Sequence, residues 1–205
     1  MRRFLYVSIS VALASCAPSL PVRQPAKVDV ECIKRFKPNF RSDLYNASVD
    51  VVGNHISGLV LFKTMTDSSK RVVFTNEAGV KFFDFGFETN GSVTTHQIIK
   101  KLNKKIVVRT LQNDFGLVLM IKVGKETPLA FREDENLKFI YGNGKNAACI
   151  VTNSDCSRLI SVEKGADKPQ TIVRLFSDGL HVPDSIFIEH LNFNMEIKLK
   201  HLARE

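Results

Sequence analysis

Residues 55–87 have the sequence HISGLVLFKTMTDSSKRVVFTNEAGVKFFDFGF, and this stretch decides the fold class. Apolar residues alternate along three short runs, His55–Met65, Arg71–Thr75 and Val80–Phe87. Such alternation is typical of β-strands with one buried face. The turn sequences TDSS and NEAG separate the runs. Short strands joined by tight turns predict an antiparallel meander.

The same pattern continues on both sides and gives about ten strands in all. The further runs are Tyr45–Val52, Leu137–Tyr141, Ala147–Thr152, Ser157–Val162, Thr171–Phe176, Ser185–Leu191 and Phe193–Leu202. One stretch, Thr94–Leu119, instead has apolar residues at helical spacing and predicts one long bent helix or two short ones. Alternating helix and strand units are missing, which argues against a parallel sheet. We therefore expect a mainly β protein with a helical insertion: a single curved antiparallel sheet, or half-barrel, with helices on its concave face.

Length and composition limit the classes of protein that this chain can belong to. Its 205 residues amount to about one domain. A composition of 44% hydrophobic and 24% charged residues excludes disorder of the whole chain. The sequence contains no Gly-x-Ser-x-Gly and no His-Glu-x-x-His motif, and its five histidines are scattered. We therefore expect no enzyme, no metal site and no cofactor.

The N-terminus resembles a bacterial lipoprotein signal. Arg2 and Arg3 precede the uncharged stretch Phe4–Ala14, which is shorter than the roughly 20 residues needed to cross a bilayer. The stretch ends in Leu-Ala-Ser-Cys16, similar to the lipoprotein box, in which the cysteine thiol receives a diacylglyceryl group. An ordinary cleaved signal followed by a chance cysteine is the alternative.

This resemblance sets the expected domain boundaries and the location. Residues 1–15 would be the signal peptide, residues 16–38 the lipidated cysteine with a proline-rich tether, and residues 39–205 the half-barrel domain. Ala17 stands where some lipoproteins retained in the inner membrane have Asp, and no acidic run follows. By resemblance to those sorting rules, we expect a lipid-anchored outer-membrane protein that faces the periplasm.

Phenylalanines gather on the strands predicted from residues 55–87. We name Phe62, Phe74, Phe83, Phe85 and Phe87 as candidate ligand-binding residues. Two interpretations remain open: an aromatic core covered by the helices, or an apolar cavity that holds acyl chains. An open curved sheet cannot fill its own hollow, so either a ligand or a helical lid must cover it.

A run of positive charge follows within the predicted helical stretch. It consists of Lys100, Lys101, Lys104, Lys105 and Arg109. One interpretation is a solvated helix face, and the other is a surface that contacts anionic lipid headgroups or an acidic protein partner. Nucleic acid is not expected to bind a secreted, lipidated chain.

Two cysteines flank a predicted hairpin turn. Cys149 and Cys156 lie on either side of Asn153, where a tight turn would place them within disulfide reach. An oxidising compartment would favour a bridge between them, which would leave Cys32 unpaired. Two free thiols are the alternative.

Taken together, the order of elements resembles the LolA/LolB superfamily, whose members carry or receive lipoproteins on a half-barrel with a helical lid. The most similar stretches are GLVLFK at 58–63, RVVF at 71–74, FFDF at 82–85 and the run Leu111–Leu119. The chain departs from the lipoprotein-receiving members at Asn76–Gly79, a polar turn where they carry a protruding apolar residue that touches the membrane.

The resemblance implies a lipid-anchored envelope protein that binds acyl chains of lipids or lipoproteins, in lipoprotein transport or insertion at the outer membrane. The expected partners are the membrane, through the lipid anchor, those acyl chains, and an envelope protein. The alternative is a structural lipoprotein that binds no ligand and scaffolds an envelope complex.

Replacing Cys16 tests the interpretation of the N-terminus. We expect Cys16→Ala to abolish labelling by a fatty-acid probe and to release the protein from membranes, because stable anchoring needs the acyl chains. Metabolic labelling and membrane fractionation of both forms measure this. A Cys16→Ala protein that stays acylated and membrane-bound would contradict the interpretation.

Overall fold

The computed structural model describes residues 23–177 and 182–202, which form one antiparallel sheet of 13 strands. The strands are β1 (Gln24–Pro25), β2 (Ser42–Val51), β3 (Asn54–Thr64), β4 (Lys70–Thr75), β5 (Lys81–Phe87), β6 (Val93–Ile98), β7 (Leu129–Glu133), β8 (Asn136–Tyr141), β9 (Ala148–Asn153), β10 (Leu159–Lys164), β11 (Thr171–Phe176), β12 (Ser185–His190) and β13 (Met195–His201). Their order in the sheet is β1-β7-β8-β9-β10-β11-β12-β13-β2-β3-β4-β5-β6.

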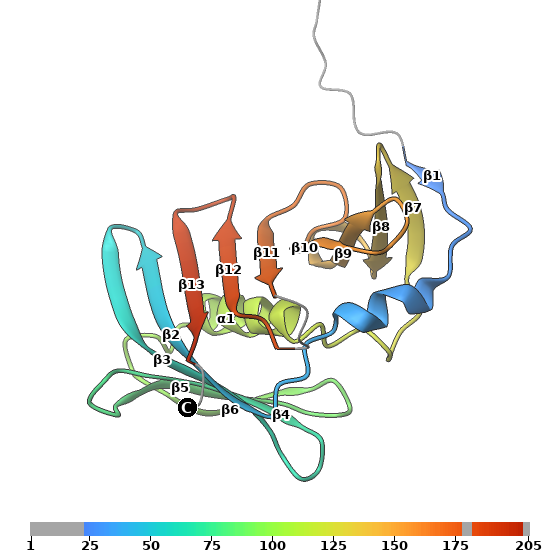
Figure 1. Cartoon of the computed structure of the whole chain (residues 1–205). Coiled ribbons are helices and arrows are strands. Elements are labelled where there is room, and N and C mark those ends of the chain that lie inside the picture. Colours follow the sequence, from blue (N-terminus) through green and yellow to red (C-terminus); the bar gives the residue numbers. More distant parts are fainter. Residues whose placement is uncertain (1–22, 178–181, 203–205) are drawn as a thin grey trace, which may run out of the picture.

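The sheet curves around one helix. The α-helix α1 (Lys105–Val118) lies in the hollow of the sheet (Figure 1) and contacts β10 and β11. Two short 3-10 helices, η1 (Val30–Phe36) and η2 (Gly144–Asn146), lie on the connections. Because β1 and β6 end the order without pairing to each other, the sheet is open. The expected open antiparallel sheet with a helix on its concave face is confirmed, with 13 strands in place of about ten.

The strands of the 55–87 stretch form as their alternation predicts. Val60 of β3 pairs with Phe74 of β4, which pairs with Phe83 of β5, and all three side chains are buried on the inner face. The turn between β4 and β5 is closed by Asn76, whose side chain accepts a hydrogen bond from the Val80 amide at 2.8 Å. These local contacts fix the register that puts the apolar residues inside.

The expectation of a helix over Thr94–Leu119 is wrong in its first part. Residues 93–98 form β6, an edge strand paired only with β5, where Thr95 lies opposite Phe85. The sequence VTTHQI is rich in β-branched residues, and the open edge of β5 offers it main-chain hydrogen-bond partners. The true helix starts at Lys105, and its inner face carries Leu111, Phe115 and Val118.

The boundary between tether and domain at residue 38 is also wrong. β1 pairs with β7, and η1 buries Ile33, which is 1% exposed. Arg23 is bound by Glu133 at 3.0 Å and by Asp167 at 2.7 Å. The fold therefore includes the chain from Arg23 onward, because these contacts order it, whereas the expected signal peptide and the expected lipidation site, Cys16, lie outside the described residues. Among the helices in the described ranges, none is long and apolar enough to span a bilayer.

The expected disulfide between Cys149 and Cys156 is wrong as well. Cys156 is bonded to Cys32, with the two Cα atoms 6.3 Å apart, and Cys149 is a buried free thiol. In the β9–β10 hairpin, Cys149 pairs across the ladder with Glu163, whereas Cys156 lies in the turn beyond both strands. Their side chains also pack in different clusters, since Cys156 belongs to the main core and Cys149 to a small second one.

The disulfide pairing gives a direct chemical prediction. Non-reducing peptide mapping should recover one linked pair, Cys32 with Cys156. Burial raises the pKa of the Cys149 thiol to about 11, so this thiol should resist alkylation until the protein is unfolded. Reducing the bridge, which closes a loop with a sequence separation of 124, should cost about 2–5 kcal/mol of stability in urea unfolding. A peptide joining Cys149 to Cys156 would contradict this pairing.

Candidate functional site

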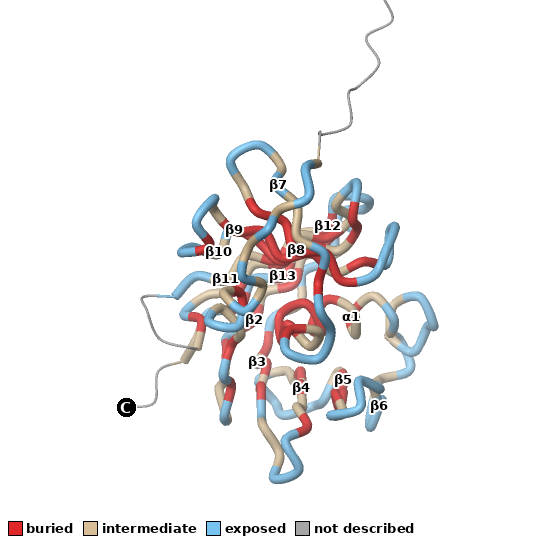
Figure 2. The backbone as a smooth tube through the Cα atoms, turned by 90° about the vertical axis from the view of Figure 1, so that its right-hand side faces the viewer, coloured by how far each residue is buried: buried red, intermediate tan, exposed pale blue. Residues whose placement is uncertain are grey.

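The inner face of α1 fills the part of the hollow lined by the phenylalanines. The Phe115 ring centre lies 5.9 Å from that of Phe62 and 5.4 Å from that of Phe83. Figure 2 shows buried positions on α1 and on the strands around it. The helix therefore covers this part of the sheet as a lid would.

All five phenylalanines named from the sequence lie in the core. Phe62 and Phe85 are 0% exposed, Phe83 is 2%, and Phe74 and Phe87 are 4%. The Phe83 and Phe85 rings stack with their centres 4.5 Å apart. The structure thus brings the five together on the concave face, as expected, but protein atoms cover them. A ligand reaches them only if α1 moves.

An apolar cavity of about 290 Å³ lies on the flank of α1. Its walls come from α1 and the segment after it, from β8 to β10 and their connections, and from Val93. The lining residues are Val93, Arg109, Gln112, Asn113, Gly116, Leu117, Met120, Ile121, Lys122, Val123, Tyr141, Asn146, Ala147, Ala148, Ile150, Val162 and Lys164. None of the five candidate phenylalanines is among them. The cavity is therefore separate from the aromatic part of the hollow.

The charged residues that line this cavity are all cations. They are Arg109, which is exposed, and Lys122 and Lys164, which are half-buried. Lys122 is paired with Glu126 at 3.2 Å. The deeper walls are apolar and buried, as at Ile150 and Val162. The cavity thus has an apolar interior and a positively charged rim.

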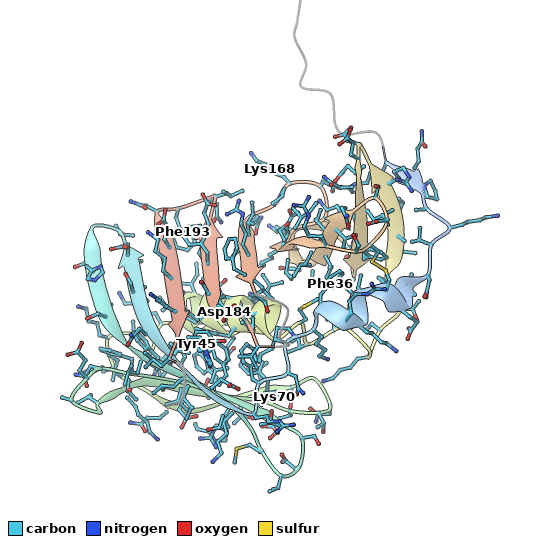
Figure 3. The ribbon with its side chains drawn as sticks, viewed as in Figure 1. Phe36, Tyr45, Lys70, Lys168, Asp184 and Phe193 are labelled. Atoms are coloured by element: carbon cyan, nitrogen blue, oxygen red, sulfur yellow. A yellow bond between two sulfur atoms is a disulfide. The ribbon has the colours of Figure 1, made fainter. Side chains whose placement is uncertain are left out.

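A buried polar pair joins α1 to the sheet. The His190 Nε2 atom of β12 lies 3.0 Å from Asp114 Oδ2, and both side chains are at most 3% exposed. His190 Nδ1 lies 3.3 Å from the Thr171 hydroxyl. Phe193, near the end of the β12–β13 hairpin in Figure 3, places its ring 4.5 Å from the imidazole. These contacts fasten the C-terminal half of α1 to the sheet.

Among the described residues, only one of the two carboxyl oxygens of Asp114 has a hydrogen-bond partner in this position. Its Oδ1 atom is buried and has no hydrogen-bond partner. Burial raises the pKa of the Asp114 carboxyl above its ordinary value, although the hydrogen bond from His190 and the charges of His190 and Lys164 oppose that shift. The buried site therefore favours the protonated carboxyl more than water does.

The five basic residues named from the sequence are all exposed, but they do not share one element. Lys100 and Lys101 lie in the turn after β6, Lys104 is the N-cap position of α1, and Lys105 and Arg109 lie on the helix. Of the five, only Arg109 lines the cavity. Sequence reasoning missed Lys122 and Lys164, which are far from this run along the chain.

The sequence analysis does not predict the pair of Asp114 and His190, although one feature of the sequence points to it. Asp114 falls between Leu111, Phe115 and Val118, on the apolar face of the helix, where an acidic residue requires a partner. The partner lies 76 residues away and has no local sequence signature. Within the described ranges, no group of three or more His, Cys, Asp or Glu residues is placed to hold a metal ion.

Comparison with solved structures identifies the fold. A LolA superfamily protein from Nitrosomonas europaea matches with a TM-score of 0.50 and 11% identity, over 86% of this chain and 92% of that chain. A DUF1329 family protein from Desulfovibrio piger matches at 0.42, with 10% identity, over 84% and 89% of the two chains. A domain assigned as an outer-membrane lipoprotein-sorting protein, from Vibrio parahaemolyticus, matches at 0.45, with 7% identity, over 84% and 88%.

The first of these likenesses shows that the chain has a LolA-like fold, and at 11% identity it shows the fold alone. The resemblance expected from the sequence is thereby confirmed at the level of architecture. No protein-family model matches the sequence, and no curated protein matches it. Function must therefore be argued from the residues of this chain.

The buried pair predicts a pH effect on stability. The pKa of Asp114 is higher in the folded state than in the unfolded state. Protonated Asp114 therefore stabilises the fold fully below about pH 4, and this stabilisation is lost as the pH rises through the folded-state pKa. Asp114→Asn keeps the shape but cannot ionise. The wild type should therefore lose stability relative to Asp114→Asn as the pH rises from 4, by at most about 1.4 kcal/mol per pH unit.

Urea unfolding of both proteins from pH 4 to pH 8 measures this difference. The groups that act on the Asp114 carboxyl are His190 and Lys164, so both must be intact in the two proteins compared. A wild type that gains stability over Asp114→Asn as the pH rises would show that the ionised pair is the favoured one.

Proposed function

We propose that this protein is a lipid-anchored lipoprotein of the bacterial envelope that binds acyl chains of lipids or lipoproteins between α1 and its sheet. The observation that supports this most is the apolar cavity of about 290 Å³ beside a helix that covers the concave face. Its volume is near the lower end of small-molecule sites, which run from roughly 300 to 1,000 Å³. No catalytic step forms part of the proposal.

We infer that the cavity of about 290 Å³ holds only part of an acyl chain. The neighbouring volume is occupied by α1, whose Phe115 packs on Phe62 and Phe83. We infer that a bound chain enters beside α1 and extends under it as the helix moves off the phenylalanines. The five candidate residues, Phe62, Phe74, Phe83, Phe85 and Phe87, then contact the chain in place of Phe115.

The lipid anchor would hold this site close to a membrane. Cys16 precedes Arg23 by seven residues, which span at most about 25 Å. Arg23 is fixed to the sheet by Glu133 and Asp167, so the tether leaves the fold at a defined place. With Ala17 after the cysteine, we propose the outer membrane as the location, with the domain in the periplasm.

The start of α1 suits contact with an anionic membrane. Lys104 and Lys105 lie at the helix N-terminus, where positive charge is unfavourable, and the first turn has no acidic residue and no side-chain cap. Ile106 beside them is 76% exposed. Anionic headgroups would offset the charge of Lys104 and Lys105, and Lys100 and Lys101 in the preceding turn extend the same surface.

One observation favours a second candidate, a structural lipoprotein that scaffolds an envelope complex without a ligand. The phenylalanines are fully covered in the structure described, as a closed core would be. In that case α1 is a permanent part of the core, and the cavity beside it binds no ligand.

Narrowing the cavity separates the two candidates. The chain Ala17–Glu205, which keeps every described residue, should bind a fluorescent fatty acid, and lipid should be extractable from it. Ala148→Leu projects extra bulk into the cavity and should weaken binding about tenfold or more with little loss of stability. Ala78→Leu makes the same exchange on an exposed turn and should leave binding unchanged. A wild-type chain that binds no probe and yields no lipid would favour the scaffold.

A further inference from the structure

The residues that line the cavity beside α1 can contact the headgroup of a ligand as well as its acyl chain. We propose that the cavity selects single-chain or double-chain lipids with an anionic headgroup, bound at the rim by Arg109 and Lys164. This inference rests on the proposed function, and it names the ligand class that the site would take.

The polar and apolar residues of the cavity lie at different depths. The rim residue Arg109 is exposed and Lys164 is half-buried, whereas the deeper wall residues Ile150, Val162 and Met120 are at most 3% exposed. Charge therefore lies at the solvent side and apolar surface lies inward. That arrangement fits an amphiphile whose head stays at the rim while its tail enters.

Two of the cations that line the cavity lack a counter-charge in the described part of the chain. The cavity lining includes three cations and no carboxylate. Among the described residues, neither Arg109 nor Lys164 has an ion-pair partner within 4 Å, whereas Lys122 is paired with Glu126. Asp114 feels the charge of Lys164 at a distance, but its Oδ2 atom is hydrogen-bonded to His190 at 3.0 Å. The two unpaired cations are therefore free to take an anion.

Two packed elements, α1 and β10, bring Arg109 and Lys164 to the same cavity. Arg109 comes from the first half of α1 and Lys164 from the end of β10, and α1 contacts β10 directly. A guanidinium can bind a carboxylate or a phosphate through two parallel hydrogen bonds, and a lysine adds a point charge. A carboxylate and a phosphate both satisfy this chemistry, so the source of the anion is left to experiment.

The test compares three ligands that share one alkyl chain: decanoate, decyl phosphate and the neutral decanol. Calorimetric titration of the chain Ala17–Glu205, below the micellar concentration of each ligand, gives the affinities. Decanoate, decyl phosphate or both should bind roughly tenfold tighter than decanol, as expected for a charge-assisted hydrogen bond at a partly exposed site. The preference should shrink with added salt, and the better anion identifies the headgroup.

Matched variants assign the effect to the rim. Arg109→Gln/Lys164→Gln should bring the affinity for the anions down to that for decanol and leave decanol binding unchanged. Lys63→Gln/Lys200→Gln removes the same charge from exposed residues outside the cavity and should keep the preference.

Equal affinity of the wild type for the anions and decanol would overturn this inference and leave the proposed function standing. Loss of the preference in Lys63→Gln/Lys200→Gln would overturn it too, because general positive charge would then suffice. Failure of all three ligands to bind would overturn the proposed function itself. The wild-type comparison remains decisive if the rim variant does not fold.

Discussion

The structure depends on one constraint: an open sheet with an apolar concave face must have that face covered. The two sheet edges, β1 and β6, do not meet, so the strands cannot close the hollow themselves. Helix α1 covers it with Leu111, Phe115 and Val118. Burying three such side chains stabilises by roughly 5–9 kcal/mol, at about 1.5–3 kcal/mol each. An acyl chain gains about 0.8 kcal/mol for each buried methylene, so several methylenes can replace the helix on the sheet.

Polar contacts determine which half of α1 is held tightly against the sheet and which half is held loosely. Asp114 and His190 fasten the C-terminal half of α1 to the sheet, while Ile106 and Lys105 at its N-terminal end are exposed. The half of the helix with fewer buried contacts requires less free energy to displace. The start of α1, which carries the run of positive charge, is therefore the end displaced most easily, whereas Phe115, which packs on the phenylalanines, lies beside the fastened Asp114.

The sequence predicted the features that depend on neighbouring residues. The strands of the 55–87 stretch appear within a residue or two of their expected bounds, because alternation and turn residues act locally. β6 cannot be predicted as a strand from its pattern, because the middle four of its six residues are exposed and show no alternation of burial. Cys32 lies in the segment expected to be a tether, so its bond to Cys156 cannot be predicted there. Lys164 reaches the cavity only because β10 packs against α1. Pairings across such distances depend on the whole fold.

The central claim is that an acyl chain lies between α1 and the sheet. Photo-crosslinking with a fatty acid that carries a diazirine along its chain, followed by peptide mapping, tests it most directly. We expect labels on the cavity side of α1 and the segment after it, such as Leu117 and Met120, and on Ile150 and Val162 opposite. Labels confined to the half-exposed outer face of the sheet, at Leu59, Leu61 and Val73, would contradict it.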